Sequence, residues 1–416
     1  MKDNSATRDT PNTATPLIMH IDLNSCFATV EQQARPLLRG KPVAILNRRT
    51  EHTAIVTASY EAKARGVKVG MKFRDVKLLC PEIIGLESDP PKYRYVYRRL
   101  MKILEDYSAH IRMKSIDEGV IDFSHSTLAY QKADLLEVGR AIKQRLIDEI
   151  GCYMRCNVGI GPNRFLAKTA AGVNKPDGLT KIDATNLREM YAKLELEDLT
   201  GISHGYSKRL RQIGIATPLQ FLDAPSEVLE KVVFKSICGR QWYERLRGWE
   251  VDAADSTLSQ VGRQYVLDDR TLGYDEVLRR LHGLTEDVAA KLRSQHVRAR
   301  GVRIYAKTYH AGVWRAHTLA ERSFHDEKTL FAAVKQLFTN APLPCYEIGV
   351  TCYHLVTEEE HQLTLFLEED QKTAAITAAI DTINTFWGAH TVHSADTLGI
   401  NKKMKRKVPF GSTRYL

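Results

Sequence analysis

Short apolar runs alternate with amphipathic segments through the first part of the chain. The runs predict buried strands at residues 17–21, 43–46, 54–58, 120–123 and 154–160. Apolar residues recur at helical spacing over residues 93–111 and 135–150, which predicts two amphipathic helices. Because strands and helices alternate, we expect an α/β sheet with helices packed on it.

The pattern changes after residue 199. Short helices around glycines are expected over residues 199–223, and the polar residues 251–259 are typical of a linker. Beyond them, a separate unit with a βαβ-like rhythm is predicted, with helices at 274–294 and 327–338 and strands at 264–267, 302–308, 314–319 and 346–354. The tail is predicted to be helical over residues 372–386 and ends in a basic run at 402–407.

Composition narrows the class of protein. The chain has 416 residues, which is too long for a single ordinary core, so several domains are expected. No apolar run approaches the roughly 20 residues that cross a bilayer, and residues 1–16 lack the apolar core of a signal peptide. We therefore expect a disordered leader at 1–16, no membrane contact and a cytoplasmic location.

Charge and cysteine content add two weaker indications. The net charge of +10 points to a polyanionic partner, although many basic proteins bind no nucleic acid. The seven cysteines are scattered and do not have the spacing of a metal site, which favours reduced thiols.

Three carboxylates stand beside predicted strands. Asp22 ends the first apolar run, and Asp117 and Glu118 precede the run at 120–123. Gathered within about 4 Å, each pair would repel by roughly 4 kcal/mol at an effective dielectric near 20, a cost that bound divalent cations remove. Oxygen ligands with open positions suit Mg²⁺, and two such ions can carry out phosphoryl transfer. The alternative is that Asp22 caps a helix and that Asp117 and Glu118 form a solvated turn.

The residues around the acids carry a resemblance. The segment IDLNSCFATVE at 21–31 closely resembles the opening motif of the Y-family translesion DNA polymerases. Further matches to this family, in its order, are RGKPVA at 39–44, VTASYEAK at 56–63, SIDE at 115–118, GIGPNRFLAK at 159–168 and NKPDG at 174–178. Together these motifs leave little room for coincidence.

The resemblance implies a multidomain α/β (α+β) protein shaped like a right hand. The implied parts are a ferredoxin-like palm, small fingers, a helical thumb with a helix-hairpin-helix, and a separate α+β little-finger domain. On this basis the palm takes residues 17–30 and 92–178, the fingers 31–91, the thumb 179–250, the linker 251–258, the little finger 259–361, and the clamp-binding peptide and C-terminal tail 362–416.

The resemblance also implies site residues. The catalytic carboxylates and metal ligands are Asp22, Asp117 and Glu118, with the Leu23 carbonyl as a further ligand for two Mg²⁺ ions, for which Mn²⁺ is the expected substitute. The nucleotide is expected to contact Cys26, Phe27, Thr57, Tyr60, Lys63 and Lys168. Phe27 falls at the steric gate that clashes with a 2′-hydroxyl; the alternative is an aromatic residue of the core.

Lys63 departs from the arginine of many relatives. It keeps the charge but loses the bidentate geometry, so looser triphosphate binding is expected. Asn24 likewise replaces an acid of many bacterial polymerase IV relatives, and it leaves the choice between a polymerase IV-like and a polymerase V-like enzyme open.

Primer–template DNA is expected to meet the thumb and the little finger. A hairpin between short helices offers backbone N–H groups to phosphates, and the predicted contacts there are Gly201, Gly205, Lys208 and Arg209. In the little finger, Arg303 and Lys307 share one face of a predicted strand and are expected to line the DNA groove. The alternative for that face is simple solvation.

A short peptide resembles the motif that binds the bacterial sliding clamp. Gln362 is followed by the apolar anchors Leu363, Leu365 and Phe366, and acidic residues lie on both sides. Anchors of this kind fill a pocket on a partner. The alternative is a last strand of the little finger.

We therefore expect a monomeric DNA-directed DNA polymerase that uses deoxynucleoside triphosphates and copies damaged templates with low fidelity. Two other functions were considered. A catalytically silent scaffold that recruits partners would have lost acidic ligands, and all three are present. A two-metal nucleotide cyclase would not explain the hairpin, the little finger or the clamp peptide.

Overall fold

A computed structural model describes residues 8–127, 130, 132–253, 258–267, 269–310, 312–357 and 367–400, with side chains of the last segment from residue 374. The chain divides into two compact units, and the boundary lies between residues 254 and 255, within the expected linker. Each unit is described separately. Within the described residues, no helix has both the length and the apolar character needed to span a bilayer.

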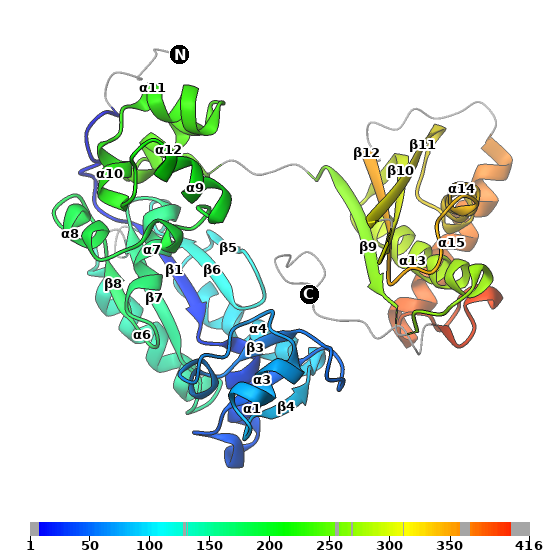
Figure 1. Ribbon diagram of the computed structural model, residues 1–416, viewed down its shortest axis with the longest axis horizontal. Helices are drawn as coiled ribbons and strands as arrows, with labels where there is room; N and C mark the ends of the chain where they lie inside the picture. Colours follow the sequence, from blue (N-terminus) through cyan, green and yellow to red (C-terminus); the bar gives the residue numbers. More distant parts are fainter. Residues whose placement is uncertain are drawn as a thin grey trace. The chain divides into compact units, whose positions relative to one another are not determined.

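The palm is built on a five-stranded sheet with the order β5-β6-β1-β7-β8 (Figure 1). Only β7 and β8 are parallel, so the sheet is more antiparallel than the alternating sequence pattern suggested. Its strands are β1 (Ile18–Leu23), β5 (Ile111–Met113), β6 (Glu118–Asp122), β7 (Cys156–Gly161) and β8 (Leu179–Lys181). The predicted palm ended at residue 178, but β8 belongs to the palm sheet because it pairs with β7. Its helices are α1 (Cys26–Ala34), α4 (Pro90–Glu105), α6 (Leu135–Glu149) and α7 (Arg164–Val173).

Alternation along β1 separates the two faces of the palm sheet. Met19, Ile21 and Leu23 are buried in the large core that also takes residues of α4 and α6. Ile18, on the other side of the strand, packs with Ala167 of α7. Asp22 shares the side of Ile18, because side chains two and four residues apart on a strand point the same way.

The helix expected over residues 93–111 is shorter than its apolar stripe. α4 ends at Glu105, and Ile111 instead begins β5. Ser108, which lies between them, donates a hydrogen bond to the backbone oxygen of Asp122 and so joins this turn to β6. A local periodicity could not reveal this long-range contact.

The fingers contain a small three-stranded sheet with the order β3-β2-β4. β2 and β3 were expected from their apolar runs, whereas β4 and the short helix α3 were not. The elements are the 3-10 turn η2 (Pro36–Leu38), β2 (Val43–Leu46), β3 (Ile55–Ala58), α2 (Tyr60–Lys63), α3 (Phe73–Leu79) and β4 (Ile84–Glu87).

The thumb is helical and packs around Trp242, Phe221 and Phe234. Gly201 starts its hairpin with φ of +100°, a left-handed conformation that favours glycine. The elements are α8 (Leu187–Ala192), η3 (Leu196–Asp198), α9 (His204–Gln212), α10 (Pro218–Asp223), α11 (Ser226–Val228), the π-helical turn η4 (Leu229–Phe234) and α12 (Cys238–Leu246).

Residues 8–12 correct part of one expectation. They were predicted to belong to a disordered leader at 1–16, but they lie against the end of the thumb. Asn12 donates its backbone N–H to the Arg247 oxygen at 2.8 Å, and the Trp249 indole donates to the Thr10 oxygen at 3.0 Å. Hydrogen bonds to a distant part of the chain can order a polar segment that has no apolar pattern of its own.

The second unit is a four-stranded antiparallel sheet with the order β11-β10-β12-β9. The last strand lies between β10 and β9, so the helix α13 joins strands that are not neighbours; a simple βαβ pairing is therefore not formed. The elements are β9 (Gln260–Val266), α13 (Tyr274–Ser294), β10 (Val297–Thr308), β11 (Gly312–Phe324), α14 (Glu327–Phe338), β12 (Glu347–Thr357), α15 (Leu367–Trp387) and η5 (Ala395–Thr397).

Candidate active site

Strand register brings the three acidic residues to one end of the palm sheet. Asp22 of β1 lies directly opposite Glu118 of β6, and side chains of directly opposed residues lie on the same face. Asp117 precedes β6, and its backbone oxygen accepts a hydrogen bond from Leu23 N at 2.8 Å. Leu23 is therefore joined through its backbone to the acidic turn.

The turn at Asp117 is held by Ser115. The Ser115 hydroxyl donates to the Asp117 carboxylate and accepts from the backbone N–H of Glu118 at 3.2 Å. This turn interrupts the strict alternation of the strand, so Asp117 and Glu118 do not have to point to opposite faces.

Lysines neutralise two of the carboxylates. Lys168 of α7 contacts both oxygens of Glu118, at 3.0 and 2.9 Å, and Lys175 binds the Asp22 carboxylate. Among the described residues, no three His, Cys, Asp or Glu side chains already form a metal-binding group. A metal ion here would have to compete with these two ammonium groups.

The acidic residues nevertheless influence each other. Burial raises the pKa of the Asp117 carboxyl, and the negative charges of Asp22 and Glu118 raise it further, against the Ser115 hydrogen bond. Burial would also raise the pKa of Glu118, but hydrogen bonds from His20 and Lys168 lower it to about 2. These carboxylates repel one another and offer oxygen ligands, which are the ligands that a hard divalent cation prefers.

A group of cations and hydroxyls lies next to the acids. Lys63 of α2 donates to the Ser25 hydroxyl at 2.7 Å and lies 4.6 Å from the centre of the Tyr60 ring. Burial lowers the pKa of Lys63, and the positive charge of Lys175 lowers it further. Two ammonium groups that repel one another favour an anion between them.

Lys175 was missed as a site residue by the sequence analysis. It belongs to the NKPDG segment, whose match was recognised, but nothing in the local pattern assigned its side chain a role. Only its contact with Asp22, 153 residues away in the chain, reveals its place in the site. Burial tends to lower the pKa of Lys175, but the Asp22 carboxylate raises it above its usual value.

Cys26 and Phe27 are the first two residues of α1, and both are buried. Phe27 is 2% exposed, and its ring stacks on Tyr93 with centroids 4.2 Å apart. The Cys26 thiol is buried, which raises its pKa, and the charges of Asp117 and Asp22 raise it further. Tyr93 is a second residue that the sequence analysis did not connect with the site.

Thr57 lies on the neighbouring fingers sheet, where it pairs with Ile45 across β2 and β3. Tyr60 follows β3 at the start of α2, one turn before Lys63. Burial raises the pKa of the Tyr60 hydroxyl, Lys175 acts in the opposite direction and Asp22 adds to the rise. These electrostatic couplings join α2 of the fingers to the palm residues Asp22 and Lys175.

The basic residues predicted to contact DNA differ in whether a carboxylate of the protein already pairs with them. On the thumb, Lys208 and Arg209 of α9 form no ion pair with any described residue, although the Arg209 guanidinium lies 5.6 Å from the centre of the Tyr206 ring. On β10, Arg303 lies 5.0 Å from the ring of Tyr353.

Lys307, on the same strand, is bound to Glu347 at 2.8 Å. Its charge is therefore already balanced by a protein carboxylate. Gly205 lies at the start of α9, where a Cβ would meet no atom within 4 Å. The predicted clamp anchors Gln362, Leu363, Leu365 and Phe366 lie outside the described residues.

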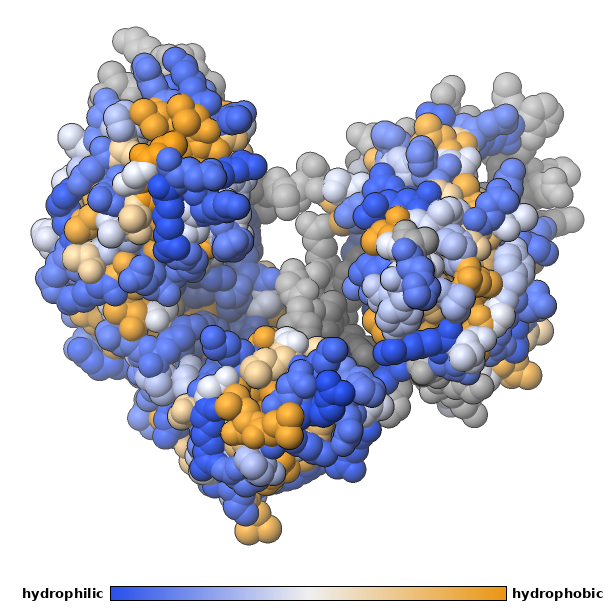
Figure 2. Space-filling view, viewed as in Figure 1, coloured by the Kyte–Doolittle hydropathy of each residue, from blue (hydrophilic) through white to orange (hydrophobic). Residues whose placement is uncertain are grey.

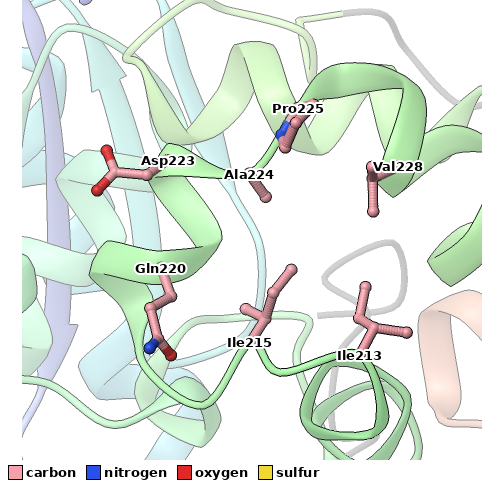
Figure 3. Close-up of a pocket in the computed structure, with 7 residues that line it drawn as sticks. All are labelled: Ile213, Ile215, Gln220, Asp223, Ala224, Pro225 and Val228. Carbon is pink, nitrogen blue, oxygen red and sulfur yellow. The ribbon is translucent and has the colours of Figure 1, made fainter.

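A cavity of about 320 Å³ lies in the thumb, between the end of α9 and the segment from α10 to α11 (Figure 3). The side chains of Ile213, Ile215 and Val228 point into it, and Gln220 and Asp223 lie at its edge. Figure 2 shows apolar surface on the thumb near α11 and α12. None of the predicted site residues lines this cavity.

Comparison with known proteins gives a consistent result. Residues 21–172 match the impB/mucB/samB family, and residues 259–365 match the C-terminal domain of that family. A DNA polymerase IV of Pelotomaculum thermopropionicum is 31% identical over 92% of this chain and 95% of its own length. A DNA polymerase IV of Moorella thermoacetica is 30% identical over 92% and 96%.

Solved structures share the fold. A Y-family DNA polymerase chimera of Dbh and Dpo4 superposes with a TM-score of 0.68 at 22% identity, covering 82% of this chain and 99% of that one. An insertion ternary complex of Dbh DNA polymerase gives 0.58 with the same coverage. The predicted fold class is confirmed.

Proposed function

The chain belongs to the impB/mucB/samB family of Y-family DNA polymerases, and we propose here which of its residues carry out low-fidelity translesion DNA synthesis. The prediction of a DNA-directed DNA polymerase is confirmed. Enzymes of this family depend on divalent metal ions and act on DNA and nucleotides. The residue roles, the number of ions and the protein partner are proposals.

We propose that Asp22, Asp117, Glu118 and the Leu23 carbonyl hold two Mg²⁺ ions. Bound there, the ions would lower the pKa of the primer 3′-hydroxyl as it attacks the α-phosphate and would neutralise the leaving pyrophosphate. The register of β1 and β6 supports this assignment, because it places Asp22 opposite Glu118. Lys168 and Lys175 balance the charge of Glu118 and Asp22 when no metal is present.

The triphosphate is proposed to contact Thr57, Tyr60, Lys63 and Lys168, with Lys175 as an addition. Charge-assisted hydrogen bonds to phosphate oxygens are strong. The repulsion between Lys63 and Lys175 supports this role, because a polyanion would relieve it. The Lys175 ammonium would be available for a phosphate if the Asp22 carboxylate served as a metal ligand.

Phe27 is proposed as the steric gate, with Cys26 beside it. The stacking of Phe27 on the buried Tyr93 supports this role, since it limits how far the ring can move away from a 2′-hydroxyl. Lys92 and Tyr93 both hydrogen-bond to the buried Glu31 of α1, which holds α4 and α1 together beneath the gate.

Primer–template DNA is proposed to contact Gly201, Gly205, Lys208 and Arg209 of the thumb and Arg303 and Lys307 of the little finger. We expect Arg303 to contribute more than Lys307, because Glu347 already balances the charge of Lys307. Contacts of this kind bind phosphates without reading sequence.

A bacterial sliding clamp is proposed as the protein partner, bound through Gln362, Leu363, Leu365 and Phe366. We further propose that the enzyme is a monomer and works in the cytoplasm, where a bacterial chromosome lies. A partner that holds the enzyme on DNA would offset weak intrinsic binding, because tethering raises the effective concentration.

One observation carries the proposed site: strand register places the acids Asp22 and Glu118 opposite one another, and the lysines Lys175 and Lys168 contact these two carboxylates. Acids can bind the metal ions of a metal-bound triphosphate, and lysines can bind its phosphates. The test is primer extension by the purified chain with Mg²⁺ and all four deoxynucleotides, on intact templates and on templates with an abasic site. Extension past the abasic site supports the proposal, and arrest at every lesion would contradict it.

A further inference from the structure

Residues 8–12 bind α12, the last helix of the thumb, and the three residues that follow it through several independent contacts. Arg8 forms an ion pair with Glu244 at 2.5 Å, and its guanidinium lies 5.7 Å from the centre of the Trp249 ring. The Trp249 indole donates to the Thr10 oxygen at 3.0 Å, and the Asn12 amide donates to the Gly248 oxygen at 3.1 Å. We call residues 8–12 the strap.

Arg247 is the centre of this contact. Its side chain is 8% exposed, so its guanidinium needs protein acceptors in place of water. The Asp9 oxygen accepts from Nε at 3.0 Å, the Tyr243 oxygen from Nη1 at 3.0 Å and the Leu222 oxygen from Nη2 at 2.6 Å. The strap therefore supplies one of three backbone oxygens around a buried cation.

The same helix supports the predicted DNA hairpin. Arg247 reaches Leu222 in α10, the helix that follows the hairpin and α9. Trp242 of α12 lies beneath Gly201, where a Cβ would come within 3.1 Å of its ring. A shift of α12 would therefore move the hairpin, because packed side chains connect the two.

Beyond the strap, the chain continues through residues 13–17 into the palm. The Leu17 oxygen accepts from Phe123 N at 2.9 Å, and β1, which carries Asp22, follows at once. The joint between palm and thumb lies nearby, where the Asn163 amide donates to the oxygens of Arg245 and Trp249 at 2.9 and 2.8 Å. Only residues 13–17 thus separate the strap, which is bound to the thumb, from the strand that carries Asp22.

We propose that the strap positions the thumb on the palm and thereby sets how long the enzyme stays on the primer duplex. Arg247 and the strap are positioning elements, because none of their contacts involves a residue of the proposed reaction. The inference rests on the proposed DNA contacts of the thumb. Release from DNA is expected to depend on the strap, whereas the chemical step is not.

The test uses the full chain with the triple substitution Arg8→Ala, Asn12→Ala and Trp249→Phe. It removes the Arg8–Glu244 ion pair, the Asn12 amide hydrogen bond and the Trp249 N–H donor, and it leaves the buried Arg247 and its hydrogen bond to the Asp9 oxygen in place. Arg188→Ala is the matched control. Arg188 belongs to the thumb and binds Asp223 with two hydrogen bonds, at 2.6 and 2.9 Å, but it does not touch the strap.

Two rates are compared: release from a fluorescent primer–template into excess unlabelled DNA, and single-turnover incorporation at saturating DNA and nucleotide. We expect release to become about three- to tenfold faster in the triple variant, while incorporation stays within about twofold. The Arg188 variant should match the wild type in both rates.

An unchanged release rate would overturn the proposal, as would a change in the incorporation rate as large as the change in the release rate. If the triple variant does not fold, Trp249→Phe alone, which removes a single N–H donor, is compared in the same two assays and must release DNA faster than the wild type. A wild-type chain that extends no primer would instead refute the proposed function, so the two failures are distinguishable.

Discussion

The Lys175 ammonium group binds the Asp22 carboxylate, although the two residues are 153 positions apart in the chain. Lys168 holds Glu118 in the same way, across 50 positions. Two proposed metal ligands are thus paired with two proposed triphosphate ligands. This pairing balances both charges before substrate arrives, and binding of a metal–nucleotide complex would exchange the partners without leaving a charge unpaired.

Replacing Lys175 with methionine should therefore have opposite effects on metal and nucleotide. Without the ammonium group, Asp22 is free to bind a cation, so we expect about tenfold tighter Mn²⁺ binding in the absence of nucleotide. The KM for the deoxynucleotide should rise, because a phosphate contact is lost. Metal titration by electron paramagnetic resonance and steady-state kinetics measure the two effects, and unchanged metal affinity would contradict the pairing.

Asp117→Asn should abolish most primer extension. The amide keeps the shape of the carboxylate but lacks its charge, and the loss of several kcal/mol of transition-state stabilisation lowers the rate by about 10²–10⁴-fold. Asp122→Asn is the control, since Asp122 ends β6, the strand that Asp117 precedes, and contacts Ser124 and Arg164 instead. Comparable rate losses in both variants, measured by single-turnover extension, would argue against a special role for Asp117.

Stability of the metal-free protein at acid pH should depend on Glu118. Its pKa is about 2 in the folded protein, against an ordinary value of 4.5. A carboxyl with a depressed folded pKa stabilises the fold above its ordinary pKa, and this contribution is lost as the pH falls from 4.5 toward 2. Urea unfolding of Glu118→Gln should show a weaker pH dependence than the wild type in this window.

The Asp117 carboxyl changes the free energy of unfolding with pH in the opposite direction. Its folded pKa is raised above 3.8, so the metal-free fold loses stability as the pH rises through and above that value. Asp117→Asn should remove this loss and stabilise the metal-free protein at neutral pH, even as it removes activity. A lower unfolding free energy for this variant at neutral pH would show that repulsion between the acids does not destabilise the metal-free protein.

Phe27→Leu should admit ribonucleotides. Leucine keeps apolar volume in the core but does not reach as far as the ring, so we expect discrimination against a ribonucleotide to fall by about 10–100-fold. Tyr93→Phe keeps the stacked ring and removes only the hydroxyl bonded to Glu31, so its sugar selection should match the wild type. If Phe27 is only a core aromatic, Phe27→Leu will lower the melting temperature and leave sugar selection unchanged.

The double substitution Leu365→Ala and Phe366→Ala should shorten the products made with a loaded bacterial sliding clamp. Loss of two apolar anchors typically costs 2 kcal/mol or more of binding at an interface, roughly a 30-fold weaker complex. Product length without the clamp provides the control and should not change. A clamp that lengthens the products of variant and wild type equally would exclude this peptide as the binding site.

Local patterns in the sequence were sufficient for several elements. The helices α13 and α14 begin and end at the predicted residues, Tyr274–Ser294 and Glu327–Phe338, because their apolar spacing is set by near neighbours. The motifs around Asp22, Asp117 and Glu118 likewise identified the family and the candidate acids without any coordinates. Short elements such as α3 and β4 have too few residues for a clear period, and they were missed.

The sequence alone determined the family, the fold class and which acids to examine, because motifs and periodicity are properties of neighbouring residues. The tertiary structure decided that β12 lies between β10 and β9, that the strap is bound to the thumb, and that Lys175 and Tyr93 adjoin the site. Each of these depends on contacts between residues far apart in the chain. Strand register and ion pairing are settled only when the whole chain packs, since the energy of each contact depends on both partners being in place.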